Sequence, residues 1–359
     1  MKLAREFGYI TTLTTTVIVV AWRKEVKASV IVIGFNGKRF LADCLSSLLD
    51  QDMPREDYEV LYVDNNSADG SVEYVQKGFP SIKIIEFKEN RGFFNAFNEV
   101  AVNIAQGKYL VALPQDTILH KKWLSELVQV AEIEDDVKVC LANTVQPTSP
   151  DHEIKEREKW IKWLHLMRTT KLGFVVPKRQ PFSRETVLML TASGTSGLIK
   201  RDLLTVTDYF FDPLMGHFIG DVELGLRVNV LGYKVALVPT SILYHIEEGK
   251  TWLDRRLLLR SLEGARDNIL AYYKNMYGLE FILILPFLLL GTPLKAYALR
   301  TTLARRALFF IAALPLSPLA FLLAVLSFSR IAISRKEVLS KRKTDRFWLL
   351  RTVLTGGRQ

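Results

Sequence analysis

The sequence is poor in the residues that build small or irregular folds. Among 359 residues there are two cysteines, five histidines, 20 glycines and 13 prolines. Because Cys44 and Cys140 are too few for a disulfide framework, we expect a reducing compartment. The modest glycine and proline counts, together with 49% hydrophobic residues, exclude a collagen-like or disordered chain. The length is sufficient for two domains, or for one large α/β domain with additions.

Acidic residues are scarce only in the last part of the chain. Residues 1–278 contain 35 basic and 35 acidic residues, whereas residues 279–359 contain 13 basic and three acidic ones. The tail therefore carries the whole net charge of +10, around the apolar runs Phe281–Leu294 and Ala307–Ser329. This composition is typical of a membrane anchor beside an anionic leaflet. Nucleic acid is not expected as a partner, since its binding would need basic residues on the body of the protein.

Neither apolar run is an uninterrupted span of about 20 residues. Pro315 and Pro318 break the second run, and the first is long enough only if it continues past Lys295 to Leu299. A two-helix hairpin and a pair of interfacial helices would both return the basic tail to the side of the membrane where the body of the protein lies, and we expect the hairpin. Buried helices of a soluble protein are the alternative. Earlier in the chain, Phe7–Trp22 predicts an uncleaved strand or interfacial segment.

Residues 28–130 alternate between apolar runs typical of buried strands and segments with helical periodicity. The expected strands are Ala28–Gly34, Tyr58–Val63, Ser81–Phe87 and Lys108–Leu113. The expected helices are Arg39–Asp50, Val72–Phe79, Asn90–Ala105 and Leu119–Val130. This order predicts an α/β fold with a mostly parallel sheet. Ligands of such sheets bind at the carboxyl ends of the strands, where Asn36, Asp64 and Asp116 are found.

Ordered motifs over about residues 28–275 resemble those of family 2 glycosyltransferases with the GT-A fold. The motifs are Val30–Gly37, Val63–Ser71, Asn90–Phe93, Ser193–Gly197, Phe211-Asp212, Gly220–Leu224, Gly232-Tyr233 and Val238-Pro239. The turn that begins at Asp64 is most similar to the rhamnosyltransferase-like branch. The resemblance implies a Rossmann-like sheet flanked by helices, followed here by C-terminal hydrophobic helices. The expected divisions are an N-terminal apolar segment, a catalytic domain and a membrane-associated part, at residues 1–27, 28–278 and 279–359.

The resemblance also implies an activity and its partners. The expected enzyme transfers a sugar from a UDP-, dTDP- or GDP-sugar to a lipid-linked or growing glycan acceptor, with inversion. Its catalytic domain is expected on the cytoplasmic face of a membrane. A polyprenyl-phosphate sugar synthase is a related alternative. A catalytically impaired membrane scaffold is another, because Pro114 and Gly220 stand where the family has acidic residues.

Asp64 is the residue that the resemblance assigns to the nucleobase. A carboxylate that accepts a ring N–H forms a strong, charge-assisted bond. From the residues alone, Asp64 could instead cap a turn or helix. The remaining nucleotide-binding residues implied by the family are Phe35, Asn36, Asn65, Asn90 and Arg91.

The implied metal ligands are Asp116 and His245, which would hold Mg²⁺ or Mn²⁺ against the diphosphate. Pro114 replaces the first acid of the family's Asp-x-Asp pattern. The alternative role for Asp116 is to cap the helix expected at Leu119–Val130. Arg266 matches a family segment close to the diphosphate, although a solvated helix face is also compatible with its sequence.

Asp221 matches the position of the catalytic base, which takes the proton of the acceptor hydroxyl. The resemblance places Glu223 at the acceptor or sugar, with Gly194 and Thr195. Residues two apart on a helix point to different sides, so Asp221 and Glu223 are not expected to act together. Arg227 is four residues after Glu223 and can pair with it, which leaves Asp221 for chemistry.

Overall fold

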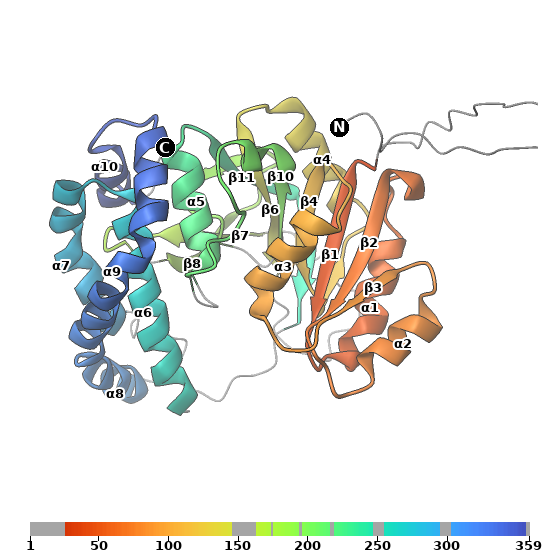
Figure 1. Ribbon diagram of the computed structural model, residues 1–359, viewed down its shortest axis with the longest axis horizontal. Coiled ribbons are helices and arrows are strands. Elements are labelled where there is room, and N and C mark those ends of the chain that lie inside the picture. Colours follow the sequence, from red (N-terminus) through yellow and green to blue (C-terminus); the bar gives the residue numbers. More distant parts are fainter. Residues whose placement is uncertain are drawn as a thin grey trace, which may run out of the picture.

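The computed structural model describes residues 26–145, 163–173, 175–193, 196–215, 219–246, 255–294 and 303–356. The expectations for residues 7–22, for Gly194 and Thr195, and for an apolar helix continuing from Lys295 to Leu299 lie outside these residues. At the centre is a mixed sheet in the order β3-β2-β1-β4-β10-β6-β11-β5, with β9 paired to β11 (Figure 1). Helices cover both of its faces, which confirms the predicted α/β class.

The first part of the sheet is parallel and follows the prediction closely. It consists of β1 (Ala28–Gly34), β2 (Tyr58–Asp64), β3 (Lys83–Glu86) and β4 (Tyr109–Pro114). The helices between these strands are α1 (Lys38–Leu49), α2 (Ser71–Gly78) and α3 (Gly92–Asn103). Every residue of β1 is buried, because its side chains point alternately into an apolar cluster on each face of the sheet.

The second part of the sheet mixes the two strand directions. β10 (Gly197–Lys200) is antiparallel to both β4 and β6 (Val137–Val145), and β6 is parallel to β11 (Lys234–His245). β9 (Val187–Met189) and β5 (Thr117–Leu119) run antiparallel to β11. The expected helix from Leu119 is wrong at its start, because Leu119 belongs to β5 and α4 runs from Trp123 to Ile133. Beside the main sheet, β7 (Trp163–Thr169) and β8 (Val175–Pro181) form a hairpin.

Two apolar clusters fix the helices to the sheet. One is formed by α1, α2 and α4 against one face, and includes Leu41, Val75 and Trp123. The other is formed by α3 and α5 (Gly220–Val230) against the opposite face. The candidate site lies at the carboxyl ends of β1 and β4.

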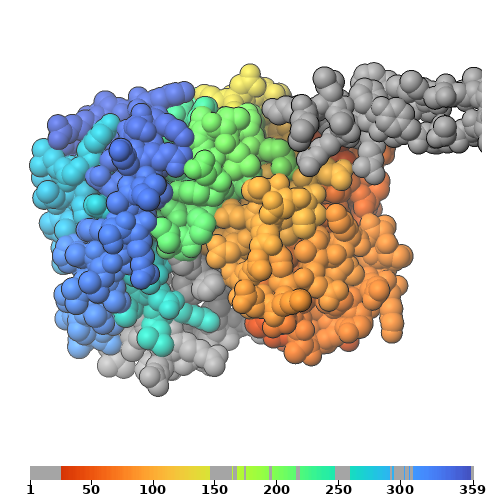
Figure 2. Space-filling model, in the orientation of Figure 1, coloured from red at the N-terminus to blue at the C-terminus, as the bar shows by residue number. Residues whose placement is uncertain are grey.

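The C-terminal helices form a layer beside the body of the protein (Figures 1 and 2). They are α6 (Arg255–Asn275), α7 (Gly278–Leu294), α8 (Leu303–Ala313), α9 (Leu316–Lys341) and α10 (Trp348–Leu354). The boundary predicted after residue 278 falls at the start of α7, whose first residue is Gly278. A third apolar cluster joins α5 and α6 on one side of this boundary to α7, α9 and α10 on the other.

Helix α9 has two different sides. Its buried residues recur at helical spacing and are mostly small: Ser317, Ala320, Ala324, Ile331 and Val338. The outer side exposes large apolar residues, including Leu319, Leu322, Leu326 and Ile333. Of the twenty exposed large hydrophobic residues in the described part of the chain, thirteen lie between Leu279 and Ile333. By length and composition, Phe310–Lys341 is a candidate membrane span, with a mean hydropathy of 2.2, and α7 is a shorter apolar helix.

Two basic residues of the tail, Arg335 and Arg342, make contacts inside the protein. Arg342 forms a fully buried ion pair with Glu280, with 2.8 Å between Nη1 and Oε2. Arg335 donates hydrogen bonds to the carbonyls of Tyr273 and Met276, at 2.7 and 2.8 Å. These two arginines bind carbonyl groups at the end of α6 and a buried carboxylate on α7, so they are not available to bind lipid headgroups.

Candidate active site

A cleft of about 410 Å³ opens at the carboxyl ends of β1 and β4. Many of the residues predicted to bind the nucleotide or the metal line it: Phe35, Asn36, Asn65, Asn90 and Asp116. Gln115, which the sequence analysis missed, also lines it, and its side chain donates to the carbonyl of Phe35 at 3.0 Å. The Gln115 amide occupies the space where Gly34 and Gly37 would carry a Cβ.

The loop after β2 is fixed to the loop after β1 by side-chain hydrogen bonds. Asn36, which has a left-handed backbone with φ of 47°, accepts the Ala68 N–H at 2.8 Å. Asp64 is 3% exposed, and its Oδ2 accepts the Ser67 N–H at 2.8 Å. The turn-capping interpretation of Asp64 is therefore confirmed for one oxygen. Its Oδ1 has only a 3.4 Å contact with the Tyr62 hydroxyl, which leaves acceptor capacity for a ligand.

Asn65 and Arg91 connect the loops before α3. Asn65 is buried and accepts the Arg91 N–H at 2.9 Å. The Arg91 guanidinium pairs with Glu99 and lies over the Phe87 ring at 4.7 Å. The backbone of Arg91 thus supports the cleft, while its side chain is engaged outside the cleft lining.

Asp116 and His245 are brought together by strand pairing. Asp116 directly precedes β5 and His245 ends β11, and these strands pair antiparallel with His245 opposite Thr117. The Ile246 N–H donates to the Asp116 carbonyl at 2.9 Å, and His245 Nε2 lies 3.3 Å from Asp116 Oδ2. The alternative role of Asp116 as a helix cap is wrong, because the N-cap of α4 is Lys122.

The Asp116 and His245 side chains are of the chemical types that can bind a divalent metal ion. One carboxylate oxygen and one imidazole nitrogen are donors that Mn²⁺ accepts, and both side chains are partly exposed, at 32% and 18%. Within the described residues, no group of three carboxylate, imidazole or thiol side chains forms a complete metal site. A metal ion held by these two side chains would need further ligands from outside the described residues.

Asp221 lies in a smaller hollow of about 30 Å³ that adjoins the cleft. Its walls include Phe94, Ala192, Ser196 and Phe211, and Phe93 lines both this hollow and the cleft. Asp221 is the second residue of α5, and its Oδ1 accepts the Val222 N–H at 2.7 Å. The Ala192 N–H donates to the Asp221 carbonyl at 3.2 Å, which attaches the start of α5 to the chain after β9.

The residue before Asp221 is a glycine because Phe94 fills the adjoining space. A Cβ on Gly220 would lie 2.6 Å from Phe94 Cδ2, and the Phe94 ring packs against Phe211 with 4.5 Å between centroids. An aromatic ring therefore stands beside the position where the related family has a glutamate.

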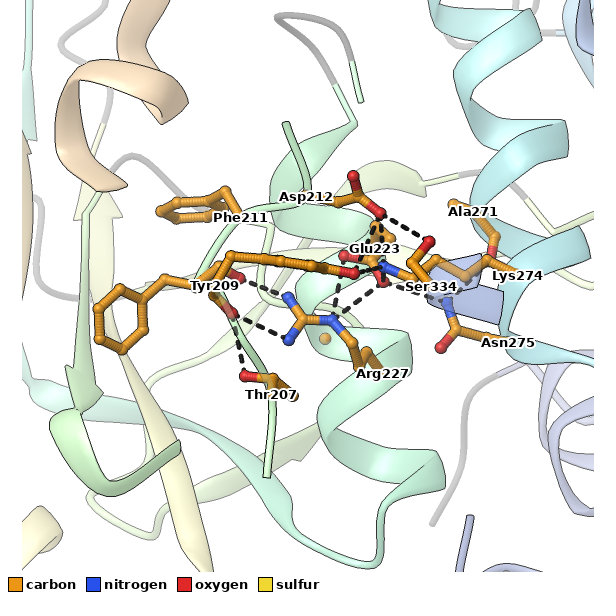
Figure 3. A network of polar contacts seen from close by, with 12 residues as sticks. Thr207, Tyr209, Phe211, Asp212, Glu223, Arg227, Ala271, Lys274, Asn275 and Ser334 are labelled. Atoms are coloured by element: carbon orange, nitrogen blue, oxygen red, sulfur yellow. Dashed lines mark hydrogen bonds and ion pairs between the residues drawn. The ribbon is translucent and has the colours of Figure 1, made fainter. Parts of the chain in front are cut away.

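Glu223 lines neither hollow and instead belongs to a buried polar network (Figure 3). Its carboxylate is fully buried and pairs with Arg227 at 3.1 Å, as predicted from their spacing, and with Lys274 of α6 at 2.7 Å. Burial by itself raises the pKa of the Glu223 carboxyl, but the Arg227 and Lys274 cations outweigh it and lower the pKa below its usual value.

The same network extends to residues that the sequence analysis did not select. Lys274 also contacts Asp212, at 2.7 Å, and the Tyr209 hydroxyl, at 2.8 Å. Arg227 donates to the carbonyls of Tyr209 and Phe210. Only the Glu223–Arg227 spacing pointed to this network in the sequence, because the other contacts join residues far apart in the chain.

Arg266 lies on α6, away from both hollows. Its guanidinium is bound to the buried Asp267, with Nε 2.7 Å from Oδ1, and its side chain is 30% exposed. Arg266 does not line the cleft.

The part of the chain from β1 to just after β10 matches a known protein family. Residues 29–204 match the family described as "Glycosyl transferase family 2". This chain carries a family 2 glycosyltransferase domain. The matched residues contain Asp64, Asp116 and both loops of the cleft, while Asp221, Glu223 and His245 follow the match.

Individual proteins resemble parts of this chain. A poly(ribitol-phosphate) beta-glucosyltransferase of Bacillus spizizenii is 33% identical over 93 residues, which are 25% of this chain and 15% of that protein. A Methanococcus voltae dolichyl N-acetyl-alpha-D-glucosaminyl phosphate 3-beta-D-2,3-diacetamido-2,3-dideoxy-beta-D-glucuronosyltransferase is 33% identical over 88 residues, 23% of this chain and 27% of that one. The chain spans between 15% and 34% of the first curated relatives that it matches.

A solved structure resembles this chain over most of its length. It is a mannosyltransferase from Pyrobaculum calidifontis in complex with GDP-Man and Mn²⁺, with 17% sequence identity and a TM-score of 0.50. The likeness covers 88% of this chain and 85% of that one, and it agrees with the predicted GT-A fold.

Proposed function

We propose that this protein transfers a sugar from a nucleotide sugar to an acceptor hydroxyl, with inversion at the anomeric carbon. The observation that carries the proposal is that Phe93 joins two hollows, one containing Asp116 and one containing Asp221. In this arrangement the nucleotide occupies the larger cleft and the anomeric carbon lies near Phe93. Asp221 then faces the acceptor from the side opposite the leaving nucleotide, as a direct displacement requires.

The larger cleft is proposed to bind the nucleotide through its loop residues. Asp64 Oδ1 accepts a ring N–H of the base, while Asn36 and Asn65 keep the surrounding loops in place. Phe35 is 46% exposed and offers its ring to the base. A UDP-, dTDP- or GDP-sugar is the proposed donor class.

Asp116 and His245 are proposed to hold Mg²⁺ or Mn²⁺ beside the diphosphate. The bound ion would neutralise negative charge on the leaving nucleotide. The mannosyltransferase from Pyrobaculum calidifontis was crystallised with Mn²⁺, which supports a divalent ion here. Asp116 and His245 orient each other at 3.3 Å, so the two donors point to one place.

The acceptor is proposed to be lipid-linked or a growing glycan, presented at a membrane. The names of two relatives, one acting on poly(ribitol-phosphate) and one on a dolichyl-linked sugar, support this class. The exposed apolar residues of α7–α9 support membrane binding, because a cluster of exposed apolar side chains marks a surface that binds a membrane or another protein. We place the catalytic domain on the cytoplasmic face, where nucleotide sugars and anionic headgroups would both be available to it.

The packing of α9 favours helices that lie in the plane of the membrane over the hairpin. Tyr273 of α6 stacks on Phe328 of α9 with 3.8 Å between ring centroids, and Arg335 binds carbonyls at the end of α6. Helix α6 also carries charged residues such as Arg266 and Asp267. If α9 crossed the bilayer in this packing, charged α6 would enter the apolar layer as well, at high cost. The interfacial arrangement keeps α6 outside.

The activity is tested with the full-length chain, a panel of nucleotide sugars and either Mg²⁺ or Mn²⁺. We expect release of nucleoside diphosphate with one donor, and at least a hundred-fold loss in Asp221→Asn. Asp50→Asn, an exposed acid 78% accessible, is the matched control and keeps wild-type activity. If no sugar nucleotide binds, the scaffold alternative is correct. If the sugar appears directly on a polyprenyl phosphate, the synthase alternative is correct.

Membrane placement is tested by flotation with vesicles that contain anionic lipid. The wild type should float with the vesicles, and a triple variant of exposed residues, Leu322→Gln, Leu326→Gln and Ile333→Gln, should remain at the bottom of the gradient. Flotation of the triple variant at the wild-type level would contradict the proposed surface.

A further inference from the structure

We propose that Lys274 is a positioning residue for sugar transfer, because it fixes both walls of the hollow that contains Asp221. This inference rests on the proposed function, since it concerns Asp221 as the base. An ammonium group has three N–H donors. Lys274 Nζ lies 2.7 Å from Asp212 Oδ2, 2.7 Å from Glu223 Oε1 and 2.8 Å from the Tyr209 hydroxyl, so each donor has one acceptor (Figure 3).

The first wall is the start of helix α5. Asp221 faces the hollow, and Glu223, two residues later, points toward α6. Lys274 therefore binds the side of α5 that faces away from the hollow, opposite Asp221. On the hollow's side, the Ala192 N–H binds the Asp221 carbonyl, and a Cβ on Gly225 would come within 2.2 Å of the Ala192 nitrogen. The helix is thus clamped between the chain at Ala192 and the Lys274 ammonium.

The second wall is the loop that contains Phe211 and Asp212. Phe211 lines the hollow, and the next residue, Asp212, turns to Lys274. Asn98 of α3 holds the Phe211 backbone from the other side, by accepting its N–H at 3.0 Å and donating to its carbonyl at 2.6 Å. One lysine therefore connects the loop of Phe211 to the helix of Asp221.

Burial makes this connection strong. Lys274, Glu223 and Arg227 have no exposed side-chain surface and Asp212 has 2%, so water does not screen their charges. The two acids and two bases balance each other. Without the ammonium, the carboxylates of Asp212 and Glu223 would approach the same site with no cation between them. Their repulsion would move the loop and α5 apart and displace Asp221 from the acceptor.

A second buried ion pair provides a matched control. Arg342 and Glu280 are also fully buried, and Arg342 also contacts the end of α6, at the Asn275 carbonyl. Neither Arg342 nor Glu280 contacts α5 or the loop of Phe211 among the contacts of the described residues. Arg342→Met therefore breaks a comparable ion pair without loosening the Asp221 hollow.

The test compares Lys274→Met with Arg342→Met in the full-length chain. For each variant, the folded fraction, the donor KM and the ratio of transfer to donor hydrolysis by water are measured. A folding defect lowers transfer and hydrolysis equally, whereas a displaced base lowers only transfer. We expect Lys274→Met to lower the ratio by roughly ten- to a hundred-fold with an unchanged donor KM. Arg342→Met should lose stability and keep the wild-type ratio.

A wild-type ratio in Lys274→Met would overturn the inference. If Lys274→Met does not fold, Asp212→Asn replaces it, because Lys274 then keeps Glu223 and the Tyr209 hydroxyl. Asp212→Asn should also lower the ratio, and an unchanged ratio would overturn the inference as well. Asp221→Asn in the same assay separates the two proposals: full transfer in that variant refutes the proposed base. Loss of transfer there, with a wild-type ratio in Lys274→Met, refutes only the positioning role.

Discussion

Gly220 and Phe94 fit together without spare space, since a Cβ on Gly220 would lie 2.6 Å from the Phe94 ring. Gly220→Glu, which introduces the acid of the related family, should therefore overpack the start of α5. We expect it to lower the free energy of unfolding by about 1–3 kcal/mol and to reduce transfer. Thermal and denaturant unfolding measure the first effect.

The double variant Phe94→Ala with Gly220→Glu is the control for this contact. Removing the ring makes room for the new side chain, so the double variant should be more stable than the sum of the two single changes predicts. Strict additivity of the two changes would show that the contact does not limit residue 220.

His245 should determine how much metal the reaction needs. His245→Ala removes one of two protein donors, so the Mn²⁺ concentration for half-maximal activity should rise roughly ten-fold or more. Asp116→Asn should have a larger effect, because it also removes negative charge. His120→Ala, which changes a histidine outside the cleft lining, serves as the control and should keep the wild-type metal dependence. An unchanged Mn²⁺ titration in His245→Ala would exclude it as a ligand.

Glu223 should make stability depend on acid pH. Its pKa in the folded protein is below the ordinary value of 4.5, so its ion pairs stabilise the fold above about pH 4.5. That contribution is lost as the pH falls through the lowered pKa. Glu223→Gln leaves Arg227 and Lys274 without this carboxylate and should cost about 3–5 kcal/mol at pH 7.

The difference in unfolding free energy between wild type and Glu223→Gln should then narrow as the pH falls below 4.5. Urea unfolding at a series of pH values measures it. The exposed Glu86→Gln should follow the wild-type curve. A difference that stays constant down to pH 3 would contradict the lowered pKa of Glu223.

Cys44 and Cys140 should be unreactive in the folded protein. Both are buried, and burial raises the pKa of each thiol to about 12, so little thiolate exists at pH 8. A thiol reagent should titrate neither cysteine in the native chain and both after denaturation. Ser340→Cys, at an exposed position, is the positive control for the reagent. Reaction of either native thiol within minutes would show that its surroundings open easily.

The first half of the fold could be predicted because its signals are local. Each of the four strands up to Pro114 has its own apolar run, and each intervening helix has its own periodicity. The later strands could not be placed in this way. β10 lies between β4 and β6, although most of β6 precedes it by more than fifty residues, and only the three-dimensional pairing reveals this. Thr117–Leu119 is too short to compete with the helical pattern that follows it.

The site shows the same division between local and distant information. The Glu223–Arg227 pair was predictable, because four residues make one helical turn. The third member, Lys274, comes from α6 and gives no local signal. Asp116 and His245 meet through the pairing of β5 with β11, which the sequence did not predict. In the sequence, the family resemblance and not the spacing of the two residues predicted that they share a metal site.

The tail shows where composition misleads. Arg335 and Arg342 count toward the positive charge that predicts a membrane anchor, but both turn inward to carbonyls and to Glu280. Composition records how many charges a segment has and not which side of its helix they occupy. The apolar residues divide as well, with Ala320 buried and Leu322 exposed on the same helix.

The shared cluster of α5, α6, α7 and α9 has a practical consequence for preparing this protein. Truncation at residue 278 would expose the apolar residues of α5 and α6 that belong to this cluster. It would also remove Lys343, whose N–H caps the end of α5 by binding the Val230 carbonyl at 2.9 Å. A variant that stays soluble without detergent should keep every helix and replace the exposed apolar residues of α9 with polar ones. The residues beyond 278 are then needed to hold α5 in place, whereas the apolar character of this part belongs to one exposed surface whose side chains can be replaced.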